Sequence, residues 1–160
     1  MDEIVFRPIG LIRTPFRDIE DMPIQPSGAR GVRGRVEVEN AYAPGLRDLD
    51  GFSHVVLLYH LHRSRGYALK VTPFMDEVPR GLFATRAPRR PNALGMSVVK
   101  LVGVEEAVVE VEGVDILDGT PLLDIKPHVP AFDCPGANRT GWLEENAARA
   151  RHLRSDDRFG

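Results

Sequence analysis

The chain has 160 residues, a net charge of −2 and a single cysteine, Cys134. This length predicts one domain whose core is large enough to be stable without a disulfide or a structural metal. A single cysteine excludes an intrachain disulfide and a metal site built from several cysteines. The nearly neutral charge excludes binding of polyanions over the whole surface, so any contact with nucleic acid must come from a local basic patch. The acidic start and the lack of a long apolar run predict neither a secretory signal nor a membrane span, which favours the cytoplasm.

Short strands separated by turn signals follow one another along most of the chain. A long loop with prolines and glycines covers 14–34, one helical turn is expected within 43–50, and the Asp-Gly pair at 118–119 predicts a tight turn. From apolar and alternating stretches we expect strands at 4–13, 35–39, 54–62, 67–73, 81–85, 97–104, 108–114 and 122–126. This pattern predicts an all-β fold, an antiparallel barrel or sandwich.

The last part of the chain departs from the β pattern. Thr140 is a suitable N-cap, acidic residues follow it, and basic residues lie near the end, which matches the dipole of a helix. We therefore expect a β domain at 1–136 and a C-terminal helical tail at 137–160.

Three groups of polar residues are candidates for chemistry. Arg86, Arg89 and Arg90 flank prolines in the loop 86–95, and arginine binds phosphate or carboxylate through paired hydrogen bonds; the alternative is a solvated loop without a partner. Asp118 lies on the predicted turn, while Asp124 and Lys126 share one face of the strand after it. The alternative is that Asp118 only forms the turn and that the other two make a surface ion pair.

Histidines form the third group. His54, His60 and His62 have the same parity, so one regular strand would place all three on one face, and three histidines can hold a catalytic zinc. The alternative, which we favour, is that they are ordinary core, rim or ligand-contacting histidines and that there is no metal. The sequence also lacks a glycine-rich nucleotide loop between a strand and a helix.

Two stretches carry a family resemblance. Residues 83–97 (FATRAPRRPNALGMS) and 118–127 (DGTPLLDIKP) resemble the signatures of the TsaA/TrmO family, also called YaeB-like, and the resemblance covers roughly 4–133. It implies a small antiparallel β-barrel that binds S-adenosylmethionine, usually as a homodimer. It also implies methylation of N6 of threonylcarbamoyl-adenosine, which lies beside the anticodon of tRNA. The chain departs from the family pattern at Ile24, Ala93 and His128, and we expect it to end before the C-terminal domain of some members.

The resemblance also implies site residues. The methyl donor would be held by Gln25, Pro26, Ser27, His62, Arg63, Arg86, Met96, Ile116, Leu117, Asp118 and Gly119. Arg89 and Arg90 would contact tRNA phosphates. Asp118 and Lys126 are the candidate catalytic groups, with Asp124 and His128 as alternatives. Two other readings stay open, a module that binds S-adenosylmethionine without transfer and a histidine metal hydrolase.

Overall fold

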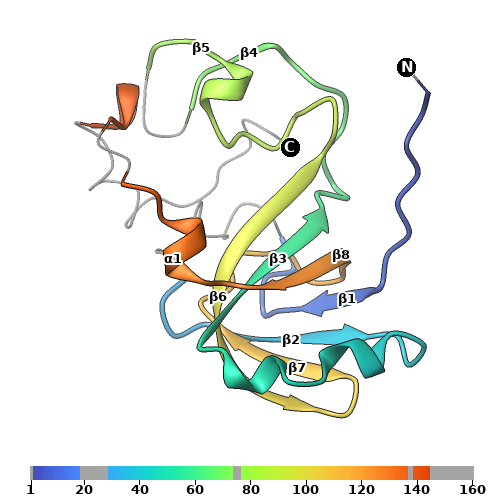
Figure 1. Cartoon of the computed structure of the whole chain (residues 1–160). Coiled ribbons are helices and arrows are strands. Elements are labelled where there is room, and N and C mark those ends of the chain that lie inside the picture. Colours follow the sequence, from blue (N-terminus) through green and yellow to red (C-terminus); the bar gives the residue numbers. More distant parts are fainter. Residues whose placement is uncertain (1, 19–28, 74–76, 137–138, 145–160) are drawn as a thin grey trace.

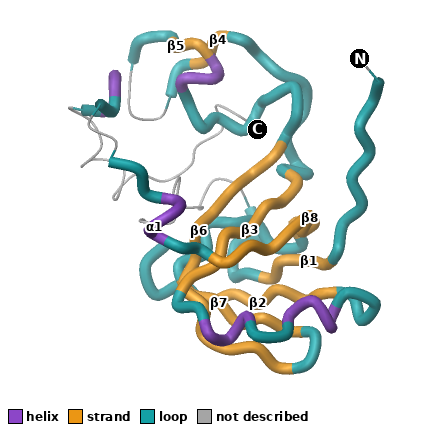
Figure 2. Tube along the Cα trace, viewed as in Figure 1, coloured by secondary structure: helices purple, strands orange, loops and turns teal. Residues whose placement is uncertain are grey.

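The computed structural model describes residues 2–18, 29–73, 77–136 and 139–144 (Figure 1). Six antiparallel strands close into a barrel in the order β1-β2-β7-β6-β3-β8. The barrel strands are β1 (Gly10–Arg13), β2 (Arg33–Val38), β3 (His54–His60), β6 (Leu94–Glu105), β7 (Val108–Glu112) and β8 (Thr120–Pro127). The predicted small antiparallel barrel is confirmed, and the helices are short (Figure 2).

Alternation of side chains explains why these segments form a barrel with one core. On β3, Val55, Leu57 and Tyr59 are buried while the residues between them are less so. Strands β6 and β7 repeat the pattern with buried Val99 and Val109. Because successive side chains of a strand point to opposite faces, each strand contributes a row of apolar groups to the interior. Closure leaves none of these six strands with an unpaired edge.

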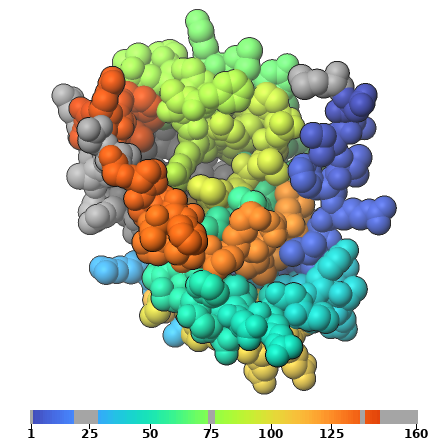
Figure 3. Space-filling view, in the orientation of Figure 1, coloured from blue at the N-terminus to red at the C-terminus, as the bar shows by residue number. Residues whose placement is uncertain are grey.

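A second, smaller unit covers the end of the barrel where β3 ends and β6 begins (Figures 1 and 3). It contains strands β4 (Lys70–Val71) and β5 (Arg80–Gly81), followed by a 3-10 helix at Leu82–Ala84. Val71, Leu82 and Ala87 form its own small core. This unit carries the arginine loop, so the fold places that loop at one end of the barrel.

Several predicted elements differ in extent from those observed. The first strand begins only at Gly10, because the apolar residues of 4–6 are exposed and pair with no strand. The expected strand 67–73 shrinks to β4, and 81–85 is mainly the 3-10 helix, closed by a hydrogen bond from Thr85 Oγ1 to the Leu82 carbonyl (2.8 Å).

The helical predictions have mixed outcomes. Two 3-10 helices at Ala43–Leu46 and Leu49–Gly51 confirm the helical turn within 43–50, and the short helix α1 (Pro130–Asp133) was not predicted. Of the C-terminal helix only a 3-10 turn at Gly141–Leu143 is described, and the rest lies outside the described residues. No helix in the described part of the chain is long and apolar enough to cross a membrane.

Candidate functional site

The turn before β8 is fastened to the segment that follows β1. The Asp118 amide donates to the Phe16 carbonyl (2.7 Å), and Asp118 Oδ1 accepts a hydrogen bond from the Thr14 amide (3.1 Å). Thr14 Oγ1 in turn donates to the Ile116 carbonyl (2.6 Å). Gly119 has φ of +73°, the left-handed conformation expected of an Asp-Gly turn. One oxygen of Asp118 therefore has a structural partner in the chain itself.

His62 and Arg63 lie at the same end of the barrel. Strand β3 ends at His60, and beyond it His62 Nδ1 lies 3.3 Å from Thr120 Oγ1 at the start of β8. Burial, together with the neighbouring charge of Arg63, lowers the pKa of His62. His62 is therefore neutral at physiological pH and suited to hydrogen bonding rather than to charge pairing.

A chain of buried hydroxyls leads to a carboxylate that the sequence analysis did not select. Tyr59 Oη and Ser97 Oγ lie 3.0 Å apart inside the barrel, and Ser97 Oγ donates to Asp115 Oδ1 (2.7 Å). Burial raises the pKa of Asp115 to about 6, and the positive charge of Arg86 opposes this shift. Burial raises the pKa of Tyr59 far above its usual value, so its hydroxyl stays protonated. Asp115 is thus a largely buried carboxyl group whose pKa is close to neutral pH.

Gly95 makes room for this chain. A Cβ at Gly95 would overlap the Tyr59 ring, so the ring can lie against the β6 backbone only where no side chain is present. We expect Gly95→Ala to displace Tyr59 and to lower the free energy of unfolding by about 1–3 kcal/mol, the usual cost of overpacking a core.

Gly103→Ala is the matched control for that substitution. It lies on the same strand, and nothing comes within 4 Å of its Cβ position. Chemical denaturation of both variants measures the difference. Equal stability of the two would show that the contact between Tyr59 and the strand does not constrain the site.

The arginine loop is held by backbone carbonyls. Arg90 Nη1 donates to the carbonyls of Thr85 (3.0 Å) and Ala87 (3.3 Å), and its guanidinium carbon lies 5.7 Å from the centre of the Phe83 ring. Arg89 Nε donates to the Arg65 carbonyl (3.1 Å). These contacts fix the shape of the loop at Arg89 and Arg90. The positive charge of the exposed Arg86 lowers the pKa values of Asp115 and Tyr59, against the effect of burial.

Lys126 is not brought together with Asp118. Its Nζ pairs with Asp124 Oδ2 (2.6 Å), which confirms that these two residues share a face. Lys126 lies six residues along β8 from Thr120, about 20 Å at the rise of an extended strand. A catalytic role for Lys126 stays a prediction, and it would act far from the Asp118 turn.

The three histidines also remain apart. His54 lies against His128, with ring centroids 6.4 Å apart, His60 is exposed at the end of β3, and His62 lies beside Thr120. Within residues 2–18, 29–73, 77–136 and 139–144, no three metal-binding side chains come close enough to hold an ion. The geometry therefore gives no support to the histidine metal hydrolase.

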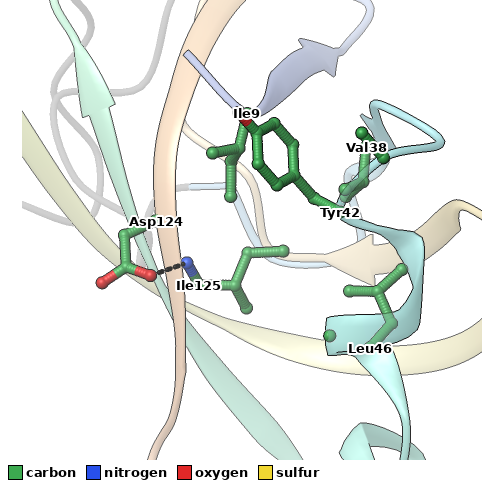
Figure 4. Close-up of a pocket in the computed structure, with 8 residues that line it drawn as sticks. Ile9, Val38, Tyr42, Leu46, Asp124 and Ile125 are labelled. Atoms are coloured by element: carbon green, nitrogen blue, oxygen red, sulfur yellow. Dashed lines mark hydrogen bonds between the residues drawn. The ribbon is translucent and has the colours of Figure 1, made fainter. Parts of the chain in front are cut away.

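A pocket of about 380 Å³ lies between Ile9, just before β1, the middle of β8 at Asp124 and Ile125, and the segment 41–46 that follows β2 (Figure 4). Its wall is mostly apolar, with Tyr42 on one side and Asp124 on the other, and Asp124 Oδ1 accepts the amide of Ile125 (2.9 Å). None of its lining residues is a predicted donor-binding residue, so we do not place the reaction there.

The chemistry of the groups at the other end fits the methyl donor that the resemblance implies. S-adenosylmethionine has a carboxylate, two positive centres and a flat adenine ring. Arg86 carries a positive charge, Asp115 and Asp118 carry carboxyl groups, and Leu94 and Met96 expose apolar surface on the adjoining strand. The predicted residues Gln25, Pro26 and Ser27 lie outside the described residues.

Three functional candidates escaped the sequence analysis, namely Tyr59, Ser97 and Asp115. One signal was available, because Asp115 stands directly between the apolar residues Val114 and Ile116, and an acidic residue that becomes buried is informative. The alternation of buried residues supplied a second signal. Tyr59 and Ser97 stand at the same alternate positions as the buried apolar residues of their strands.

Fold and site together define a class, the small closed β-barrels with a polar site at one end covered by an arginine-rich loop. Residues 11–134 match the family model described as the tRNA-methyltransferase O N-terminal domain. The chain therefore belongs to the tRNA-methyltransferase O (TrmO) family, which confirms the resemblance found in its motifs.

Individual relatives agree with this assignment. A probable S-adenosyl-L-methionine-binding protein of Pyrococcus abyssi is 50% identical over 98% of this chain and 85% of its own length. A tRNA (adenine(37)-N6)-methyltransferase of Mus musculus is 37% identical over 82% of this chain but 32% of its own length. The crystal structure of TrmO from Pseudomonas aeruginosa has a TM-score of 0.74 at 38% identity, covering 88% of this chain and 63% of that chain.

Proposed function

We propose that this protein is an S-adenosylmethionine-dependent tRNA methyltransferase that acts on N6 of threonylcarbamoyl-adenosine beside the anticodon. The observation that carries the proposal is the family match over 11–134. This range includes Thr14, His62, Arg86, Asp115 and Asp118 at the polar end of the barrel. The names of several relatives, which mention binding of S-adenosyl-L-methionine or methylation of tRNA adenine N6, support the donor and the acceptor.

The donor site would be built from five segments of the chain. Arg86 would bind the carboxylate, His62 and Arg63 would line the side near Thr120, and Ile116, Leu117, Asp118 and Gly119 would present their backbone. Met96 would add apolar contact, and Gln25, Pro26 and Ser27 would complete the site. The geometry supports Asp118 chiefly as the group that fixes the Thr14 segment, and its predicted catalytic role stays a proposal alongside that of Lys126.

When bound, the donor supplies a methyl group on a positively charged sulfur. As the new carbon–nitrogen bond forms, the acceptor nitrogen loses its proton, and the electrons of the broken carbon–sulfur bond leave with the sulfur. A base with a pKa near the working pH is best suited to take that proton. Asp115 meets this condition, with Ser97 donating to Oδ1 and thereby orienting the carboxylate so that Oδ2 accepts the proton.

We further propose a homodimer in the cytoplasm. The family resemblance supports the dimer, and the single exposed cysteine is compatible with a reducing compartment. We also propose the division into a barrel domain at 1–136 and a tail at 137–160, and the closed barrel supports the first of these two parts.

Incubation with S-adenosylmethionine labelled in the methyl group and bulk tRNA tests the proposed function. We expect label in RNA, and nucleoside analysis after digestion should place it on N6 of a threonylcarbamoyl-adenosine. Stabilisation of the protein by the donor without any transfer to RNA would instead favour a module that binds S-adenosylmethionine. Label on another nucleoside would correct the acceptor but keep the enzyme class.

A further inference from the structure

The small unit exposes aromatic and apolar side chains next to arginines. We call this surface the platform and define it as Tyr67, Leu69, Phe83, Arg89 and Arg90. Its parts are joined by backbone hydrogen bonds from Ala68 to the Arg89 carbonyl (3.4 Å) and from Leu82 to the Leu69 carbonyl (2.9 Å). Figure 3 shows the side chains of this unit at the surface over one end of the barrel.

Phe83 is the most exposed aromatic residue of the platform, at 75% of its full surface. The neighbouring Leu82 fills the small core, so Phe83 on the same 3-10 helix is directed outward. Arg90 lies over the ring while two backbone carbonyls hold its guanidinium. The aromatic ring is therefore presented in a fixed position, which lowers the entropy cost of binding a flat partner.

The arginines around the platform have no acidic partner among the described residues. Arg89 bonds the Arg65 carbonyl, Arg90 bonds two carbonyls, and no ion pair with a described carboxylate involves Arg63, Arg65, Arg89 or Arg90. On a protein of net charge −2, this is a local excess of positive charge. The positive charge favours an anionic partner, and the exposed ring of Phe83 favours a partner with a flat group that can stack on it.

Unpaired RNA has both properties, because its phosphates are negative and its bases have free faces. A duplex offers phosphates but keeps its bases stacked inside. We propose that the platform docks an unpaired stretch of RNA, with one base stacked on Phe83. Arg90 then acts as a positioning residue that fixes the ring, and Arg89 contacts phosphate. This inference rests on the proposed function, which supplies an RNA loop as substrate.

The test compares Phe83→Ala, Phe83→Tyr and Phe132→Ala. Phe132 lies on α1 and is 80% exposed, so it controls for loss of an exposed phenylalanine elsewhere. The probes are an anticodon stem-loop RNA and a blunt RNA duplex of equal length, with affinity measured over a range of salt concentrations. Phe83→Ala should weaken stem-loop binding by about 5- to 100-fold, the effect of losing one stacked base, and leave the salt slope unchanged.

The other variants define the roles further. Phe83→Tyr should bind the stem-loop as the unmutated protein does, and so should Phe132→Ala. Arg89→Ala should reduce the slope of log affinity against log salt concentration by about 0.7–0.9, which corresponds to one lost phosphate contact. Affinity for S-adenosylmethionine should be unchanged in Phe83→Ala, and so should the weak binding of the duplex.

Four results would overturn the proposal. These are unchanged stem-loop binding in Phe83→Ala, an equal loss for the duplex, a loss of donor affinity, or dissociation of a dimer in sedimentation, which would make a second copy of the chain the partner. In each case the unmutated protein still binds RNA and the proposed function stands. Failure of the unmutated protein to bind the stem-loop at all would reject the proposed function as well.

Discussion

Replacing Asp115 with asparagine should nearly abolish methyl transfer while leaving a folded barrel. Asparagine has the same shape and still offers an oxygen to Ser97, which now donates to Asp115 Oδ1 at 2.7 Å. It cannot take a proton from the acceptor nitrogen. Loss of a general base slows the chemical step by about 100- to 10,000-fold, and we expect single-turnover transfer to fall by that amount. Donor affinity should change much less.

The pH dependence follows from the same group. Asp115 must be ionised to accept a proton, so the single-turnover rate of the unmutated protein should rise with pH through about 6 and then level off. At pH 5 the rate should be about tenfold below its plateau. The groups that face Asp115 are Ser97, Tyr59 and Arg86, and of these only the arginine is charged in this range.

Stability should change in the opposite direction to activity. Because the folded-state pKa of Asp115 lies above its usual 3.8, the protonated carboxyl stabilises the fold below pH 3.8, and this contribution is lost as pH rises to about 6. Asparagine does not titrate. At pH 8 Asp115→Asn should therefore be as stable as the unmutated protein or more so, by about 3 kcal/mol at most, and the difference should close toward pH 4.

Glu110→Gln is the control for the loss of one carboxylate. Glu110 is an exposed residue of β7, outside the proposed site, and its replacement should leave rate and pH profile unchanged. A fully active Asp115→Asn would remove Asp115 from the chemistry. An inactive variant that also melts much earlier at pH 8 would assign the residue a structural role instead.

Arg86→Ala should have the second large effect, on donor binding. Arg86 is an exposed arginine whose charge acts on both Asp115 and Tyr59, so it borders the buried polar chain. A charged hydrogen bond to the donor carboxylate contributes about 1.5–3 kcal/mol, so affinity for S-adenosylmethionine should fall by about 10- to 100-fold in equilibrium binding.

The same substitution makes a second, linked prediction. Without the positive charge of Arg86, the pKa of Asp115 should rise further, and the midpoint of the pH–rate profile should move above 6. Arg86→Lys keeps the charge but not the paired hydrogen bonds, so its midpoint should stay near that of the unmutated protein while donor affinity still falls. Arg47→Ala, at an exposed position outside the site, serves as the control. Unchanged affinity and midpoint in Arg86→Ala would contradict both roles.

Much of the fold can be predicted because it depends on local patterns. The hairpin of β6 and β7 follows from two valine-rich stretches, and Glu106 in its turn has a positive φ of 51°. The turn at Gly119 follows from the Asp-Gly pair. Barrel closure depends on the pairing of β1 with β8, more than a hundred positions apart, and no local pattern fixes which distant strands meet.

The site is less predictable because it depends on that long-range register. Pairing of β3 with β6 brings Leu57 opposite Ser97, and a separate loop brings Asp115 to the same hydroxyl. In the sequence alone, nothing links Ser97 to Asp115. The motifs singled out Arg86 and Asp118 as candidates, but they could not show that Asp118 fastens the Thr14 segment. Nor could they show that Lys126 lies far along β8.

Methylation of defined tRNA tests the central claim most directly. The measurement is mass analysis of nucleosides after incubation with S-adenosylmethionine and tRNA prepared with or without the threonylcarbamoyl group. The proposed function predicts a gain of one methyl group on the modified adenosine and none on the unmodified tRNA, and the product should disappear with Asp115→Asn. No methylated nucleoside from either tRNA, despite saturation of the protein with the donor, would contradict it.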